Sequence, residues 1–416
     1  MEFNTYDRNI LRGLAKEVAE IAADPVMAKR KQMWVEHNGL HSTYPMMLVF
    51  PEGAWEELLP MSEMQCQDLK AREIEWNLRS RIYSYHHFQD DTVVEAEWVE
   101  MAVLRDTGWG LEPRRKESTT ARGAYAIEPV LKDRSDLKKM HFPELIYGEK
   151  ATRINVECMQ GLFGDILNVK PKGIAHLSYH LPSQYIFLRG LGEMMMDMVE
   201  APGFVHEVMA FFEEGHHRLL KQILELNLLS LNNDNTYHSS GGNGYTDELP
   251  KPGFDPNRVR PCDIWSSAES QELAQVSPKM HNEFVMQYEK RLLEPFGLTG
   301  YGCCEDLTRK LDDVFTIPHI RRISCSPFAD VDVCAEKLKG NYIFSWKPKP
   351  SHLVGNFDPV AIRSYVRHTL EVTQANGCVL EMILKDTHTV EHHPERMDEW
   401  TRIARETINE MVGVHQ

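Results

Sequence analysis

Cysteine is scarce in this sequence, and long apolar runs are absent. Eight cysteines in 416 residues are too few to form a disulfide scaffold. No run approaches the roughly 18 consecutive apolar residues that a membrane span needs. Residues 1–23 mix charges into a helical pattern and lack the uninterrupted apolar segment of a signal peptide. We therefore expect a cytoplasmic protein with no membrane partner.

Positive charge is also in short supply. Lysine and arginine total 46 against 62 aspartates and glutamates, and the formal net charge is −16. This balance argues against binding to nucleic acid, because nucleic acid is itself strongly negative. The chain also has no low-complexity tract, no Gly/Ser linker and no short repeat. An enzyme or a small-molecule binding protein with an ordinary globular core remains.

What the sequence contains throughout is an alternation of short apolar runs with amphipathic helical patterns. Such alternation indicates parallel strands joined by helical crossovers. We expect an α/β fold, a closed (β/α)8 TIM barrel over 45–416 after an N-terminal helical extension over 1–44. The chemistry of such barrels lies at the carboxyl ends of their strands. Strands are expected at 45–50, 92–104, 175–180, 228–233, 259–265, 298–304, 320–326, 341–346 and 377–386.

The segment that follows the expected strand 228–233 is rich in polar side chains. Asn233, Asp234 and His238 come first, and a glycine-rich loop, SGGNGY, then leads to Tyr245. A phosphate-binding loop would run straight into a helix N-terminus, and this loop does not. Two interpretations remain, a wall over a bound ligand or a plain solvated loop. We take the four named residues as candidates for binding a ligand.

Acidic residues occur at two further expected strand ends. Asp263 and Trp265 are two positions apart, so a strand would present both on one face. Asp263 then either lines a pocket or is an ordinary loop acid. Glu381 lies within the apolar run VLEMIL, where an unpaired charge would cost several kcal/mol. Its carboxylate must be paired, protonated or bound to a metal, and Asp386 and His388 follow it at the strand's end.

The stretch GYGCCE places two adjacent cysteines at another expected strand end. Alternation along a strand puts Tyr301, Cys303 and Glu305 on one face and Cys304 on the other, so the two sulfurs should not converge. A disulfide between neighbours is also strained. No CxxC or HExxH motif accompanies the pair. Either one thiolate binds a metal with a carboxylate's help, or the cysteines are two small buried residues.

Five dispersed stretches carry a family pattern, namely PMMLVFPEGAWEELLP, YIFLRGLGEMMMDMVEAPGFVHEVM, CDIWSSAESQELAQVSPKMHNEF, TGYGCCEDLTRKL and ILKDTHTVEHHPERM. Together they resemble the uroporphyrinogen decarboxylase superfamily of (β/α)8 barrels. The similarity runs along 45–416 and is greatest to the cobalamin-dependent methyltransferase branch, including methyltransferase I of the corrinoid-linked O-demethylase systems of anaerobic metabolism. The decarboxylases carry an RQAGRY stretch where this chain reads FPEGAWEE, which disfavours a polycarboxylate substrate.

The resemblance also implies a metal site. Methyl-transferring members carry a His-x-Cys-Gly stretch whose cysteine matches Cys303, and together with a late ligand it holds zinc. Tyr301 stands in place of the histidine and Cys304 in place of the glycine. Glu305 is then the expected substitute ligand. The late ligand should be Glu381, Asp386 or His388.

The resemblance implies a zinc-dependent methyltransferase. Its expected donor is a small methylated compound such as a methoxylated aromatic, and its expected acceptor is the cob(I)alamin of a partner corrinoid protein. The expected catalytic residues are Glu305, Asp263 and Tyr301. The residues expected to bind the donor or the corrinoid are Asn233, Asp234, His238, Tyr245 and Trp265. Asp263 and Asn233 would position the donor, with Trp265, Tyr245 and Tyr301 packing on its ring. The alternatives are a metal-free decarboxylase-like enzyme acting on a tetrapyrrole and a non-catalytic binding barrel. A homodimer is possible, but the sequence gives no oligomeric state.

Overall fold

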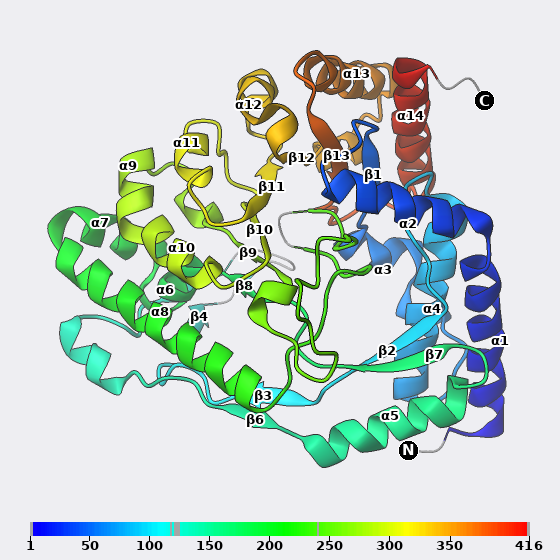
Figure 1. Ribbon diagram of the computed structural model, residues 1–416, viewed down its shortest axis with the longest axis horizontal. Coiled ribbons are helices and arrows are strands. Elements are labelled where there is room, and N and C mark those ends of the chain that lie inside the picture. Colours follow the sequence, from blue (N-terminus) through cyan, green and yellow to red (C-terminus); the bar gives the residue numbers. More distant parts are fainter. Residues whose placement is uncertain (1–2, 117–118, 120–124, 239–240, 414–416) are drawn as a thin grey trace.

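The computed structural model describes residues 3–116, 119, 125–238 and 241–413 and has an α/β fold (Figure 1). One parallel sheet of seven strands, in the order β1-β13-β12-β11-β10-β9-β8, forms its centre. The first and last strands along the chain are therefore neighbours. The strands are β1 Met46–Val49, β8 Ser178–Tyr179, β9 Trp265–Ala268, β10 Leu298–Tyr301, β11 Ile320–Cys325, β12 Ile343–Trp346 and β13 Val379–Leu384.

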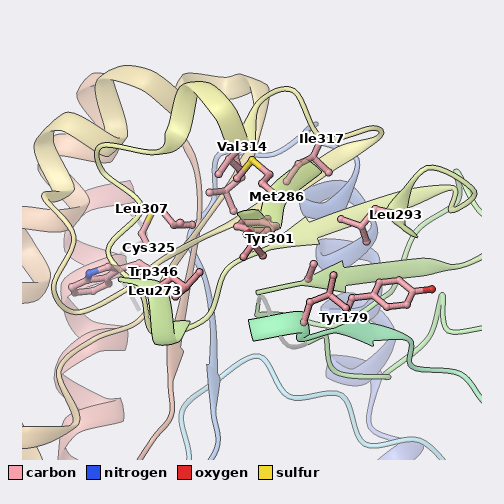
Figure 2. Close-up of a cluster of buried hydrophobic side chains, with 14 of the residues drawn as sticks. Tyr179, Leu273, Met286, Leu293, Tyr301, Leu307, Val314, Ile317, Cys325 and Trp346 are labelled. Carbon is pink, nitrogen blue, oxygen red and sulfur yellow. The ribbon is translucent and has the colours of Figure 1, made fainter. Parts of the chain in front are cut away.

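Helices cover the sheet, and the main apolar core lies between the two. All residues of β9, β10, β12 and β13 are buried, as expected for parallel strands. Figure 2 shows part of this core, where Tyr301 lies near Met286 and Val314. The α-helices are α1 Thr5–Ala22, α2 Pro25–Asn38, α3 Trp55–Leu58, α4 Leu69–His87, α5 Glu149–Phe163, α6 Leu181–Arg189, α7 Leu191–Glu200, α8 Pro202–Glu225, α9 Pro278–His281, α10 Gln287–Leu293, α11 Leu311–Val314, α12 Val331–Leu338, α13 Pro359–Ala375 and α14 Glu395–Val412.

Shorter elements complete the chain. No helix in the described ranges has the length and apolar character needed to cross a membrane. The short helices are η1 Glu52–Ala54, η2 Met61–Glu63, η3 Arg134–Lys139, η4 Pro261–Asp263, η5 Gln271–Leu273, η6 Asn282–Met286 (a π-helix), η7 Lys339–Asn341 and η8 Pro350–Leu353. Three small ribbons pair β2 Glu97–Met101 with β7 Asn168–Lys172, β3 Leu104–Asp106 with β6 Leu145–Tyr147, and β4 Arg114–Lys116 with β5 Ala126–Glu128.

Three of the expected strands differ most from the structure, and two others, 175–180 and 298–304, are shorter than expected. The segment 92–104 forms β2 and β3, which lie outside the seven-stranded sheet. The segment 228–233 makes only one parallel bridge, between Ile174 and Leu229. The strand expected over 259–265 instead begins at Trp265, after the turn η4. Pro261 opens that turn, because its fixed φ and missing N–H suit a helical start better than a strand.

The N-terminal helices form a core of their own. Leu11 of α1, Ile74 of α4 and Phe163 of α5 belong to an apolar cluster separate from the main core. Figure 1 shows α1 alongside α4 at the edge of the molecule. The end of α2 instead reaches the sheet, where Asn38 accepts a hydrogen bond from Arg322 of β11 at 2.6 Å. The expected extension over 1–44 therefore contacts both parts of the molecule.

Candidate functional site

Two thiols, an ammonium and a carboxylate meet at the carboxyl edge of the sheet. Cys303 and Cys304 follow β10, and Lys385 and Asp386 follow β13. The two Sγ atoms are 3.5 Å apart, and Lys385 Nζ donates to Cys303 Sγ at 3.5 Å. Cys304 Sγ in turn donates to Asp386 Oδ2 at 3.3 Å. We call these four residues the thiol–lysine cluster.

A glycine turn brings the two sulfurs together. Gly302 has a φ of +91°, which an L side chain rarely adopts, so the alternation of the strand ends at Tyr301. A Cβ on Gly302 would also lie 2.6 Å from Leu307 Cδ1. The expectation that Cys303 and Cys304 point to opposite faces is therefore wrong, because it extended the strand's period through a turn.

The surroundings of the cluster raise the pKa of both Cys303 and Lys385. The hydrogen bond with Cys304 and burial raise the pKa of Cys303, and Lys385 opposes them. Burial lowers the pKa of Lys385, but the phenol of Tyr237 and the Cys303 thiol outweigh it and the net shift is upward. The second lysine at this edge, Lys347, is fully buried, and burial lowers its pKa to about 8.

The last strand is tied to the first at this edge. Asp386 N donates to Glu52 Oε2 at 3.0 Å, and β1 and β13 are paired in parallel. Asp386 and Glu52 both have positive φ values, +59° and +49°. Non-glycine residues with positive φ are uncommon and concentrate at functional sites. Burial raises the pKa of Glu52.

A histidine–carboxylate pair stands beside the cluster. His180 Nδ1 lies 3.0 Å from Glu269 Oε1, and Ser178 Oγ lies 2.7 Å from His180 Nε2. Burial lowers the pKa of His180, but its hydrogen bond to Glu269 outweighs burial and the net shift is upward. Glu269 and Cys303 lie close enough for the carboxylate's charge to raise the thiol's pKa. The pair therefore belongs to the same site.

Tyr301 and Glu305, two of the expected catalytic residues, serve the protein's own packing. Tyr301 OH donates to Glu289 Oε2 at 2.9 Å within the helix-covered core, so its ring does not face the carboxyl edge. Glu305 accepts hydrogen bonds from the amides of Ser270 at 3.0 Å and Cys303 at 2.8 Å. Burial raises the pKa of Glu305. Glu305 thus fixes the turn that carries the thiols.

Asp263 lies at the amino end of β9, whereas the sequence placed it at the carboxyl end of a strand. It pairs with Arg260 at 2.7 Å and accepts the Lys251 amide at 3.0 Å. Its expected role in positioning the substrate is therefore wrong, because the strand starts after η4 rather than ending there. Trp265 begins the same strand, is fully buried, and donates from Nε1 to Gly244 O at 3.1 Å.

Glu381 is paired, as its burial required, and its partner is a cation of the protein. Arg322 Nε lies 3.0 Å from Glu381 Oε1, and His37 Nε2 lies 3.2 Å from Oε2. Burial opposes ionisation, but the charge of Arg322 outweighs it and lowers the pKa of Glu381 to about 2. His388 is exposed. Of the three expected late ligands, only Asp386 lies at the thiols.

The remaining candidate binding residues lie elsewhere. Asn233 and Asp234 line a cavity of about 750 Å³ beside β2 and β7, and its lining does not include the cysteines. Asp234 pairs there with Lys172 at 2.7 Å. His238 and Tyr245 are both buried, and the His238 ring packs against that of Trp265 with centroids 5.3 Å apart.

The donors of the thiol–lysine cluster suit zinc by their chemistry. Zinc accepts thiolates and carboxylates, and ligands bound at about 2.3 Å around a tetrahedral ion lie about 3.7 Å apart. The 3.5 Å and 3.3 Å separations at Cys304 are close to that value. Within the described ranges, however, no three His, Cys, Asp or Glu side chains stand together as a metal-holding group. Lys385 is the cation beside the thiols.

The sequence interpretation did not include His180, Lys385 or Glu269 among the site residues. Each follows a buried strand directly, at β8, β13 and β9 respectively. For Lys385 the available signal was a charged residue in the first position after the mostly apolar run VLEMIL. Nothing in the sequence states which strands are neighbours, so the meeting of the three could not be read from it.

Comparison with known proteins adds a likeness of fold. A methyltransferase from Methanosarcina mazei matches 92% of this chain and 99% of its own, with a TM-score of 0.51 and 9% sequence identity. At that identity the likeness concerns the fold alone. The sequence matches no family model and no curated protein.

Proposed function

We propose that the chain is a methyltransferase whose reaction takes place at the thiol–lysine cluster. The observation that carries this proposal is the meeting of Cys303, Cys304 and Asp386 at the carboxyl edge of a parallel sheet, where enzymes of this architecture place their chemistry. The fold shared with a methyltransferase supports the same class. The resemblance of the sequence to the corrinoid-dependent branch points in that direction too.

In the finer form of the proposal, the sheet belongs to a closed (β/α)8 barrel of the uroporphyrinogen decarboxylase type. One observation supports closure beyond the seven strands. The segment after α4 lies beside β1, where the Asp91 amide donates to Met47 O at 2.8 Å. The amide side chain of Asn235 then donates to Val93 O at 2.7 Å. These contacts extend the sheet edge at β1 through 91–93 to Asn235.

The methyl donor is proposed to be a small methoxylated aromatic, and the acceptor the cob(I)alamin of a corrinoid protein. Cys303, Cys304 and Asp386 would hold a zinc ion, and they would have to draw closer together to do so, because within the described ranges no three such side chains stand together as a metal-holding group. When bound, zinc supplies Lewis-acid polarisation of the donor's heteroatom. Lys385 would then have to leave Cys303 Sγ, which it contacts at 3.5 Å. The protein's own task is to hold the donor in line with the acceptor and to exclude water.

Metal analysis combined with methyl transfer tests the proposal. Purified protein should bind about one zinc per chain, and Cys303→Ala, Cys304→Ala and Asp386→Ala should each lower that content. Methyl transfer to free cob(I)alamin should be measured with methoxyaromatics, methylamines and methylthiols. Cys262→Ala is the matched control, because Cys262 lies in η4 at the other end of β9.

The outcomes separate the parts of the proposal. Folded protein without zinc that still transfers methyl groups would refute the metal site alone. No transfer from any donor in the panel would refute the methyltransferase and favour a binding protein. If a tetrapyrrole carboxylate is consumed instead, the decarboxylase-like alternative is correct.

A further inference from the structure

A polar chain of three side chains runs across the carboxyl ends of β8 and β9. Ser178 Oγ lies 2.7 Å from His180 Nε2, and His180 Nδ1 lies 3.0 Å from Glu269 Oε1. Tyr179, between Ser178 and His180, is buried in the helix-covered core, whereas the side chains of its two neighbours contact each other. The Glu269 amide donates to Tyr179 O at 3.1 Å and fixes the carboxylate beside the histidine.

The geometry determines which nitrogen of His180 can exchange a proton. A carboxylate only accepts hydrogen bonds, so Nδ1 carries a hydrogen toward Glu269. Nε2 therefore faces Ser178 and the open edge of the sheet. The His180 side chain is 36% exposed against 6% for Glu269, so a ligand can reach the ring while the carboxylate stays covered. This is how a carboxylate orients a histidine that works as an acid or base.

The charges around His180 favour its protonated form, and the thiols are close by. Glu269 acts electrostatically on both His180 and Cys303, so a single side chain separates the imidazole from the thiol–lysine cluster. The charged or titratable groups whose electrostatic effects link them to His180 are Glu269, Glu272, Glu305, His176 and His216.

We propose that His180 donates a proton to the atom that leaves when the methyl group is transferred, with Glu269 as its positioning residue. The inference rests on the proposed function. The bond between the methyl carbon and the donor's heteroatom breaks, and its electron pair stays on the heteroatom. The methyl group goes to the acceptor nucleophile, and the heteroatom takes the proton of His180 Nε2. The neutral imidazole keeps its Nδ1 hydrogen on Glu269 and regains a proton from water.

A series of methoxyaromatics with different leaving groups tests this role. Poor leaving groups depend on a proton donor more than good ones do. His180→Gln should lose about 10²–10⁴-fold in methyl transfer for an unactivated anisole, and far less for a nitro-substituted one. Glu269→Gln should show the same trend with a smaller loss. Added imidazole should restore transfer in His180→Ala, again most strongly for the poor leaving groups.

The control is another histidine–carboxylate pair of the chain. His368 Nε2 lies 3.0 Å from Asp332 Oδ2, and both side chains are more than half exposed on the surface. His368→Gln should transfer methyl groups at the wild-type rate across the series. An equal loss for every leaving group in His180→Gln, without imidazole rescue of His180→Ala, would overturn the inference and leave the methyltransferase standing. Wild-type protein inactive on every donor would overturn both.

Discussion

At the scale of single residues, the charge of Lys385 should affect how strongly the two thiols bind a metal ion. Its ammonium lies 3.5 Å from Cys303 Sγ and 3.8 Å from Asp386 Oδ1, so it occupies the place of a cation among potential metal ligands. Two unit charges 4 Å apart interact by about 4 kcal/mol in a protein-like medium. The lysine and a metal ion should therefore compete for the same donors.

Lys385→Met should raise the affinity for zinc by about tenfold or more, because it removes this competing charge. The measurement is a titration against a chelator of known affinity at fixed pH. Lys349→Met is the control, since Lys349 is exposed on the loop after β12. Equal or weaker zinc binding in Lys385→Met would mean that the lysine supports the metal site rather than competing with it.

Glu381 offers a second residue-scale prediction. Glu381→Ala should lower the free energy of unfolding by about 3–5 kcal/mol, because it leaves the buried guanidinium of Arg322 without its carboxylate partner. Arg322→Met combined with Glu381→Leu should recover most of that loss in denaturant unfolding. The pKa of Glu381 falls from 4.5 to about 2 on folding. The pair's contribution is therefore complete above about pH 4.5 and is lost as the pH falls toward 2. An unchanged unfolding midpoint in Glu381→Ala would contradict the assignment.

At the scale of elements, the turn after β10 positions the thiols. Gly302→Ala should cost about 1–3 kcal/mol in stability, because its Cβ meets Leu307 at a positive φ. It should also change the alkylation rates of Cys303 and Cys304 and lower zinc binding. Gly355→Ala is the control, because Gly355 has a φ of +64° with open space around it. If both variants alkylate like the wild type, the turn does not set the thiol geometry.

The same turn separates what could be predicted from the sequence, the strands, from what could not, the directions of the side chains after them. β11, β12 and β13 were predicted within three residues of their ends. Alternation failed at Gly302, where one residue with a positive φ reversed the direction of Cys304. Asp263 was misplaced because Pro261 converts the expected strand into a turn. Local pattern finds buried strands well, but the turns after them depend on contacts that only the folded chain makes.

At the scale of the whole molecule, the main core and the separate cluster of α1, α4 and α5 both support the fold. Leu11→Ala, in the cluster of α1, α4 and α5, should lower the local stability there by about 2–5 kcal/mol. Hydrogen exchange should report faster amides in these three helices, while β10–β13 keep their protection. A uniform loss across the molecule would show that the two cores unfold as one unit.

The hydrogen bond between Glu52 and Asp386 joins residues 334 positions apart. During synthesis, the chain must therefore leave the ribosome as far as the residues after β13 before the thiols meet Lys385 and Asp386. A product truncated before β13 would keep both cysteines but lack their ammonium and carboxylate partners. Premature termination should thus yield an inert polypeptide with two exposed thiols, a form that oxidants and proteases in the cell can reach.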